Sequence, residues 1–256
     1  MTRELEKARL VKQRLRAGDV VLAAQIELND PAVIEILGTT GFDLLVVDTE
    51  HSPHSPENVQ AMLQAGMNGD AVVLARPMKL DAELIRLYLD LGSPGVLCPF
   101  IETAEQAALL VSACRYPPVG IRGYGPRRAG LYGTAAAEYF ESANEAVLCV
   151  PIIESKTAVE NIDGIVAVEG IDAVCIGPVD LSISLGVFNE YESEPYLKAF
   201  TAVEAACARH GKAMGTGAYS IEHAKACRDG GVQLLLTLVD DQALRAGALA
   251  TVEALR

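Results

Sequence analysis

Eight short runs of apolar and β-branched residues, each followed by a longer amphipathic run, constrain the fold of this 256-residue chain most. Runs that are apolar throughout are typical of parallel strands, which are buried on both faces and need helices as crossovers. The expected strands are 20–26, 44–47, 71–75, 95–98, 146–153, 173–176, 213–216 and 233–238. The expected helices are 31–39, 56–65, 81–91, 103–114, 157–168, 195–210, 221–230 and 241–256.

Each expected helix begins near a Pro, Thr, Ser or Asp, the residues that favour helix starts. Eight strands with eight following helices predict an α/β fold of the (β/α)8 TIM barrel type. An additional amphipathic helix at 3–17 precedes the first strand, and we expect it to cap the bottom of the barrel. The whole chain, 1–256, is therefore expected to form a single barrel domain.

The composition excludes several classes of function. A net charge of −13 argues against binding to nucleic acid and to anionic membranes. Residues 1–12 are charged and lack the apolar core of a signal peptide, and no run approaches the length of a membrane span. Six scattered cysteines without a CxxC pair predict small buried side chains in a reducing cytosol. We therefore expect a cytoplasmic protein whose partners are small molecules.

One long segment, 116–145, interrupts the alternation and is rich in glycine and proline. Loops of this length in compact domains are usually functional or disordered. Its aromatic and basic residues favour a lid or a contact with another subunit, and the alternative is a solvated loop. These residues are Arg122, Tyr124, Arg127, Arg128 and Tyr132.

Two carboxylates, Glu154 and Asp180, follow the fifth and sixth expected strands. In a TIM barrel the catalytic groups lie at the carboxyl ends of the strands, so these side chains should meet at one rim. Two carboxylates with water form an oxygen site that suits Mg²⁺ or Mn²⁺. The alternatives are a helix N-cap for Asp180 and a surface ion pair for Glu154.

A histidine and an arginine follow the second and third strands. His51 comes after Asp48 and Glu50, where acidic neighbours could tune it for proton transfer, although a lone histidine is more often structural. Arg76 could hold a carboxylate or a developing enolate oxygen. Its alternative is a salt bridge to Asp48 or Asp81. A Gly-Pro-Val turn at 177–179 could expose backbone N–H groups to a carboxylate.

The motifs around these residues resemble the metal-dependent (class II) pyruvate aldolases of the HpcH/HpaI aldolase/citrate lyase family, which includes 4-hydroxy-2-oxoheptanedioate aldolase. The resemblance covers residues 18–247. It rests on the motifs FDLLVVDTEHSPHS, VVLARP, LDLGSPGVLCPFIETAEQA, RYPPVGIRGYGPRRA, PIIES, VEGIDAVCIGPVDLSISLG and GKAMGT, in this order.

The resemblance implies a (β/α)8 barrel that binds Mg²⁺, Mn²⁺ or Co²⁺ through a glutamate and an aspartate, which match Glu154 and Asp180. It implies that Asp48 orients a metal-bound water. Gly177 and Val179 match the positions whose backbone N–H groups bind the carboxylate of pyruvate.

The resemblance also implies a reaction, the reversible cleavage of a 4-hydroxy-2-oxo acid to pyruvate, or a close 2-oxo acid, and an aldehyde. His51 matches a histidine that transfers the proton together with an acidic partner, here Asp90. Arg76 matches the arginine that stabilises the enolate. Related enzymes are commonly hexamers, trimers of dimers that exchange C-terminal helices. We therefore expect a homohexamer in which helix 241–256 is exchanged and segment 116–133 contacts a neighbouring subunit.

Three departures from the family pattern are present. Ile152 stands where these aldolases commonly have a glutamine, which removes one contact to the bound oxo acid. The motif before His51 reads DTEH where DGEH is commoner, and the usual Arg-Val-Pro is shortened to Arg76-Pro77. The expected metal ligands and His51 are intact, so we expect activity.

Other functions remain as alternatives. A class I aldolase would need a Schiff-base lysine at a strand end, for which Lys156 is the candidate. A CoA-thioester lyase of the citrate or malyl type would need more chain to cover CoA. A non-catalytic metal-binding relative is the third alternative.

Overall fold

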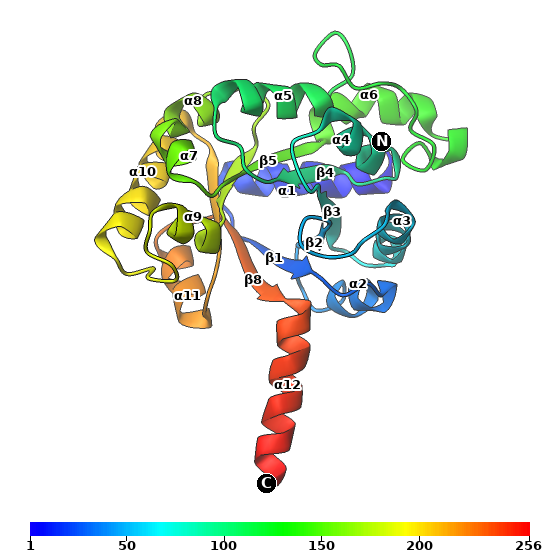
Figure 1. The fold of residues 1–256 in the computed structure, drawn as a ribbon. Coiled ribbons are helices and arrows are strands. Elements are labelled where there is room, and N and C mark those ends of the chain that lie inside the picture. The colour runs from blue at the N-terminus through cyan, green and yellow to red at the C-terminus, as the bar shows by residue number, and fades with distance from the viewer.

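Eight parallel strands close into a barrel in the order β1-β2-β3-β4-β5-β6-β7-β8 in the computed structural model, which describes residues 1–256 (Figure 1). This confirms the predicted (β/α)8 barrel, because every predicted strand is present within two residues of its expected ends. The strands are β1 (Val21–Ile26), β2 (Leu44–Asp48), β3 (Val72–Arg76), β4 (Gly95–Cys98), β5 (Leu148–Ile153), β6 (Ala173–Ile176), β7 (Ala213–Gly217) and β8 (Leu234–Val239).

The helices surround this barrel, and several begin at a capping side chain of the kind that the sequence predicts. Asp30, Ser55 and Thr103 each accept a hydrogen bond from a backbone N–H of the helix that follows. The helices are α1 (Arg3–Ala17), α2 (Pro31–Leu37), α3 (Pro56–Ala65), α4 (Ala82–Asp90), α5 (Ala104–Cys114), α6 (Ala136–Ala146), α7 (Lys156–Glu160), α8 (Ile162–Val166), α9 (Pro178–Ser184), α10 (Glu194–His210), α11 (Ile221–Asp229) and α12 (Asp240–Leu255). Two short 3-10 turns, η1 (Gly66–Asn68) and η2 (Leu131–Gly133), complete the elements.

The structure differs from the prediction in two segments. The segment predicted as a long loop ends in α6, whose buried residues Tyr139, Ala143 and Ala146 have helical spacing. The glycines and prolines before residue 134 obscured that pattern. The helix predicted at 157–168 is divided into α7 and α8 at Asn161, whose backbone leaves the helical region.

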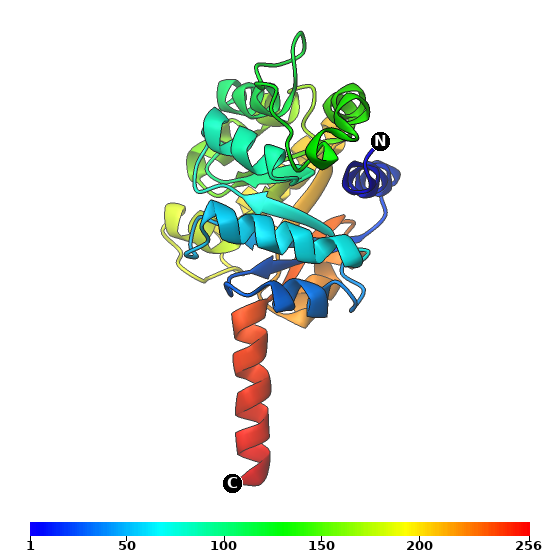
Figure 2. The same cartoon turned by 90° about the vertical axis from the view of Figure 1, so that its right-hand side faces the viewer.

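Helix α1 closes one end of the barrel, as predicted (Figure 2). Its residues Ala8, Val11 and Leu15 share a buried cluster with the side chains that fill the barrel interior. A buried lysine of α1, Lys12, forms an ion pair with Asp172 at 3.1 Å and so anchors the helix to the barrel wall. Because this end is plugged, an active site can open only at the carboxyl ends of the strands.

Helix α12 continues from the end of β8 and points away from the barrel (Figures 1 and 2). Asp240 is its only buried residue. The apolar stripe of this helix is therefore not buried on its own barrel. The stripe comprises Leu244, Ala248, Leu249, Val252 and Leu255.

All six cysteines are buried and free, as the composition predicted. None of the helices has both the length and the apolar character that crossing a membrane requires.

Candidate active site

A buried ion pair joins the carboxyl ends of β2 and β3. Asp48 and Arg76 are paired in the strand register, and Nε of Arg76 donates to Oδ1 of Asp48 at 2.7 Å. A second guanidinium nitrogen donates to Oδ2, so the pair is bidentate. Burial raises the pKa of Asp48, but Arg76 outweighs burial and the pKa is lowered. The alternative of a salt bridge from Arg76 to Asp48 is thus present, whereas Asp81 caps α4 instead.

Glu154 follows β5 and is only 3% exposed, so the alternative of a surface ion pair was wrong. Its Oε1 accepts a hydrogen bond from the backbone N–H of Phe100 at 2.6 Å. Phe100 has a left-handed backbone (φ 50°), which a bulky residue adopts only at a cost of order 1–3 kcal/mol. A Cβ at Gly177 would lie 2.6 Å from Oε2 of Glu154, so only glycine at that position leaves this oxygen undisturbed.

The surroundings of Glu154 favour its protonated form. Burial, together with the carboxylates of Glu50 and Asp180, raises its pKa to about 7, although the Phe100 N–H and Arg76 act to lower it. Asp180 is the third residue of α9, whose N-cap is Gly177, so the alternative of an N-cap at Asp180 was wrong.

Glu154 and Asp180 are the residues that would hold a divalent cation. Both offer carboxylate oxygens, the ligand type that Mg²⁺ and Mn²⁺ prefer. No group of three or more His, Cys, Asp or Glu side chains is arranged to hold a metal ion. Two protein ligands would leave the remaining coordination positions to water and substrate, the arrangement that catalytic sites need.

His51 lies on the loop after β2, with its side chain 59% exposed. Its nearest acidic group is Glu50, whose Oε2 is 3.7 Å from Nε2 of His51 and 3.5 Å from Nε of Arg76. Oε2 of Glu50 is buried and has no hydrogen bond. The sequence indicated Glu50 only as a neighbour of His51, but the structure places it between the histidine and the arginine.

Asp90, the expected partner of His51, ends α4 and accepts a hydrogen bond from Arg122 at 2.8 Å. No hydrogen bond or ion pair joins it to His51 in this chain. Instead, Asp90 faces a shallow surface pocket that it lines with Arg86 and Tyr124.

The arginines of the 116–133 segment divide into two kinds. Arg122 is 2% exposed and stacks over the ring of Tyr116. Arg128 is also buried and donates to the carbonyls of Leu63 and Leu91 at the ends of α3 and α4. The alternative of a fully solvated loop was therefore wrong, although Arg127 is exposed.

The turn before α9 offers fewer free donors than expected. The N–H of Gly177 already donates to the carbonyl of Ile153 at 3.1 Å. Val179 lies in the first turn of α9, where backbone N–H groups have no partner within the helix. Val179 is thus the better placed of the two expected donors.

A polar cluster on β1 and the loops beside it was not singled out from the sequence. Nε2 of Gln25 donates to Oδ2 of Asp48 at 3.2 Å and also to Glu27, which accepts a further bond from Ser52. The available signal was a glutamine inside an otherwise apolar strand.

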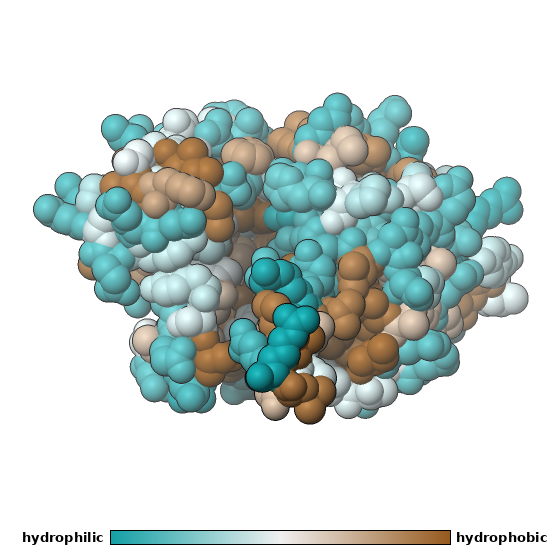
Figure 3. Space-filling view, turned by 60° about the horizontal axis from the view of Figure 1, so that its bottom comes forward, coloured by the Kyte–Doolittle hydropathy of each residue, from teal (hydrophilic) through white to brown (hydrophobic).

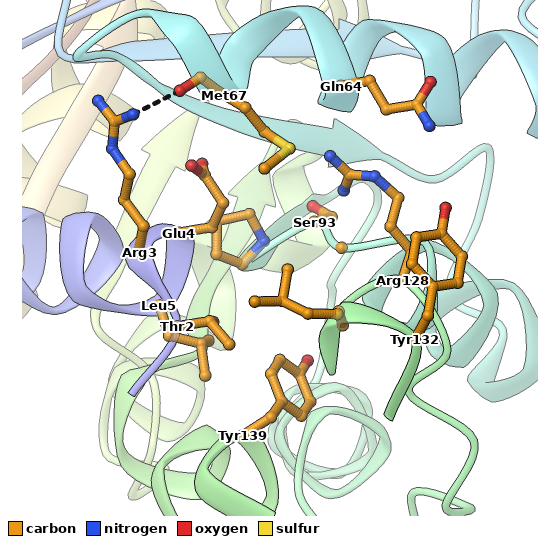
Figure 4. Close-up of a pocket in the computed structure, with 14 residues that line it drawn as sticks. Thr2, Arg3, Glu4, Leu5, Gln64, Met67, Ser93, Arg128, Tyr132 and Tyr139 are labelled. Atoms are coloured by element: carbon orange, nitrogen blue, oxygen red, sulfur yellow. Dashed lines mark hydrogen bonds between the residues drawn. The ribbon is translucent and has the colours of Figure 1, made fainter. Parts of the chain in front are cut away.

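A separate cavity of about 200 Å³ lies near the amino end of β4, between α1, α3 and the segment 128–132. Figure 4 shows Arg3 bonded to the carbonyl of Met67 and the guanidinium of Arg128 beside Ser93. Neither Glu154 nor Arg76 lines this cavity. Its position at the start of a strand distinguishes it from the catalytic rim.

The chain is similar to known proteins over most of its length. The family model described as HpcH/HpaI aldolase/citrate lyase matches residues 24–245. A 2-keto-3-deoxy-L-rhamnonate aldolase of Escherichia coli O9:H4 (strain HS) is 36% identical over 234 residues, 90% of this chain and 86% of that protein.

Two solved structures share the whole fold. The HpcH/HpaI aldolase/citrate lyase family protein of Burkholderia cenocepacia J2315 has a TM-score of 0.92 and 29% identity, over 97% of this chain and 100% of that one. The HpcH/HpaI aldolase of Desulfitobacterium hafniense DCB-2 has a TM-score of 0.89 and 30% identity, over 95% of each chain.

Proposed function

Because the chain belongs to the HpcH/HpaI aldolase/citrate lyase family, we propose a defined reaction for the site at the carboxyl ends of its strands. The protein is a carbon–carbon lyase, a class II aldolase. Its proposed substrate is a 4-hydroxy-2-oxo acid whose aldehyde part is uncharged, such as 2-keto-3-deoxy-L-rhamnonate, which retro-aldol cleavage would convert to pyruvate and lactaldehyde. The observation that carries the proposal is the buried carboxylate of Glu154, with one oxygen held by Phe100 and the other unclaimed.

Glu154 and Asp180 would hold the divalent cation, for which Mg²⁺, Mn²⁺ and Co²⁺ are the candidates. When bound, such a cation acts as a Lewis acid on the carboxylate and oxo oxygens of the substrate. Arg76, immobilised by Asp48, would stabilise the negative charge that develops on the enolate oxygen. Val179 would donate its N–H to the substrate carboxylate.

His51 would take the proton of the 4-hydroxyl group as the bond between C3 and C4 breaks. The aldehyde would then leave, and C3 of the enolate would be protonated to give pyruvate. We propose Asp90 from a second copy as the acidic partner of His51, because Asp90 faces outward in this chain and does not reach its own His51.

Assembly is part of the proposal. β1 and β8 are incompletely covered, since Leu22 is 38% exposed and the last four residues of β8 are half-buried. In Figure 3, α12 points toward the viewer, and apolar side chains lie on it and on the surface beside its base. We propose that α12 of a partner covers such a face, within a cytoplasmic homohexamer built as a trimer of dimers.

A turnover assay tests the function. Purified protein with Mg²⁺, Mn²⁺ or Co²⁺ should convert 2-keto-3-deoxy-L-rhamnonate to equal amounts of pyruvate and lactaldehyde. Cleavage of malyl-CoA or citryl-CoA to acetyl-CoA and a 2-oxo acid, without cleavage of any 4-hydroxy-2-oxo acid, would favour the CoA-lyase alternative instead. Trapping of pyruvate on Lys156 by borohydride would favour the class I alternative.

A further inference from the structure

The polar cluster on β1 has a defined hydrogen-bonding character. Both N–H bonds of the Gln25 amide point to carboxylates, one to Asp48 and one to Glu27. In a side-chain amide the nitrogen donates hydrogen bonds and the oxygen only accepts them. The two carboxylates therefore fix which way the Gln25 amide is turned. The amide oxygen of Gln25 then has no donor in the chain, and it is not among the buried atoms. It is an accessible acceptor.

Glu27 adds a second acceptor and a negative charge. Its carboxylate accepts hydrogen bonds from Gln25 and from Ser52, and a carboxylate can accept about four. No cation pairs with Glu27 in this chain, since the nearby Arg76 is engaged by Asp48 and Glu50. The cluster therefore presents acceptors and excess negative charge, and it offers no free donor.

The backbone of the cluster is held in place by the base of α12. Asp240, at the base of α12, is 5% exposed and accepts the backbone N–H groups of Glu27 and Leu28 at 2.8 and 3.1 Å. A fixed backbone and two side-chain bonds leave Glu27 little freedom. Acceptors that are already positioned lose less entropy when a ligand binds.

The cluster is also next to the reacting centre. Ser52 directly follows His51 in the chain, and Gln25 contacts Asp48, which holds Arg76. In the proposed reaction His51 takes the proton from the C4 hydroxyl. Substituents on C5 are one bond further from C4, on the aldehyde side, and the proposed reaction therefore brings them near this same loop.

We propose that Gln25 and Glu27 form the subsite for the aldehyde part of the substrate, and that they select an aldehyde with a hydroxyl group next to its carbonyl. The hydroxyl donates to the free acceptors of the cluster. An aldehyde that ends in a carboxylate is rejected, because it brings a second negative charge to Glu27 and meets no donor. This inference rests on the proposed function and names the substrate class that the site takes.

Three aldehydes test this selection in the aldol direction with pyruvate. They are 2-hydroxypropanal, propanal and 4-oxobutanoate, which compare a hydroxyl group, no polar group and a carboxylate. The wild-type kcat/KM should be at least about tenfold higher for 2-hydroxypropanal than for propanal, the range expected from one or two hydrogen bonds. It should be lowest for 4-oxobutanoate.

Two variants assign the selection to the cluster. Gln25→Leu should lower kcat/KM for 2-hydroxypropanal to the level of propanal and leave propanal unchanged. Glu27→Gln should raise kcat/KM for 4-oxobutanoate by about tenfold. Glu35→Gln is the control, because Glu35 is an exposed carboxylate on α2 and its removal should change no ratio.

Exchange of the methyl protons of pyruvate with solvent distinguishes failure of the proposed function from failure of the proposed subsite. This exchange reports enolate formation and needs no aldehyde. A wild-type protein that neither exchanges nor adds pyruvate to any aldehyde overturns the proposed function and this subsite together. Normal exchange with equal rates for 2-hydroxypropanal and propanal overturns the subsite alone. So does a Gln25→Leu variant that exchanges normally but loses both aldehydes equally.

Discussion

At the scale of single residues, the site is defined by which charges have partners. Asp48 and Arg76 neutralise each other in a bidentate pair, so Arg76 is rigid before any substrate arrives. In contrast, Oε2 of Glu154 and Oε2 of Glu50 have no hydrogen bond in the chain. Unsatisfied carboxylates beside a fixed guanidinium are costly to stability, and such a cost is typical of a functional site.

Substitutions of His51 and Arg76 should separate two steps of the reaction. His51→Ala should slow retro-aldol cleavage by roughly 100-fold or more, as is usual for loss of a general base, and should leave pyruvate proton exchange measurable. Arg76→Ala should lose both cleavage and exchange, because the enolate is no longer stabilised. His54→Ala is the matched control, since His54 is bonded to Asn58. Cleavage by His51→Ala at the wild-type rate would refute the assignment of His51.

The raised pKa of Glu154, about 7, predicts how metal binding depends on pH. A proton on Glu154 competes with the cation, so Mn²⁺ should bind about tenfold more weakly at pH 6 than at pH 8. The same shift makes the folded, metal-free protein retain a proton that the unfolded chain releases. The contribution of Glu154 to stability therefore falls as pH rises from about 4.5 to about 7.

Calorimetric titration with Mn²⁺ at several pH values measures this dependence. Glu160→Gln, which removes an exposed carboxylate, should titrate like the wild type. An affinity that does not change between pH 6 and pH 8 would contradict the assignment of Glu154 as a ligand.

Residue positions relative to strand ends could be predicted from the sequence, but their contacts could not. Glu154, Asp180 and Arg76 follow apolar runs, and parallel strands bring such positions to one rim. The bond from the Gly177 N–H to Ile153 and the pairing of Asp90 with Arg122 depend on contacts between distant segments. No local pattern contains that information.

At the scale of elements, the plug formed by α1 depends on one buried charge. Lys12 is 6% exposed, and burial lowers its pKa although Asp172 opposes that effect. Helical spacing predicted α1 and its place at the barrel bottom, because its apolar stripe needed a partner. The anchoring of its lysine to Asp172 required the closed barrel.

Lys12→Ala should destabilise the protein by about 3 kcal/mol, because it leaves the buried Asp172 without its principal partner. Urea unfolding measures this difference. Lys225→Ala, which removes an exposed lysine, should change the free energy of unfolding by less than about 0.5 kcal/mol. Equal stability of the two variants would show that the pair does not anchor α1.

At the scale of the whole molecule, α12 is the element without a place in its own chain. Its stripe of leucine and valine is exposed, and the face of β1 and β8 beside it is only partly covered. Exchange of the helix between copies would bury the stripe and would cover β1 and β8. The sequence predicted this helix and its exchange, but only the structure shows that its apolar residues are not buried on the same barrel.

Substitution within the stripe tests the exchange. Val252→Asp should reduce the mass in light scattering, because a charge would be buried at the contact. Ala250→Asp, on the opposite side of α12, should keep the wild-type mass. A wild-type protein that is an active monomer of 27.1 kDa at every concentration would contradict both the exchange and the dyad between copies.

Removal of the metal tests the central claim most directly. Protein treated with a chelator, shown by elemental analysis to be metal-free, should release no pyruvate from 2-keto-3-deoxy-L-rhamnonate. Addition of Mg²⁺, Mn²⁺ or Co²⁺ should restore the activity of the wild type, whereas Glu154→Gln should stay inactive in the same buffer. Full activity of the metal-free protein would contradict a class II mechanism at Glu154 and Asp180.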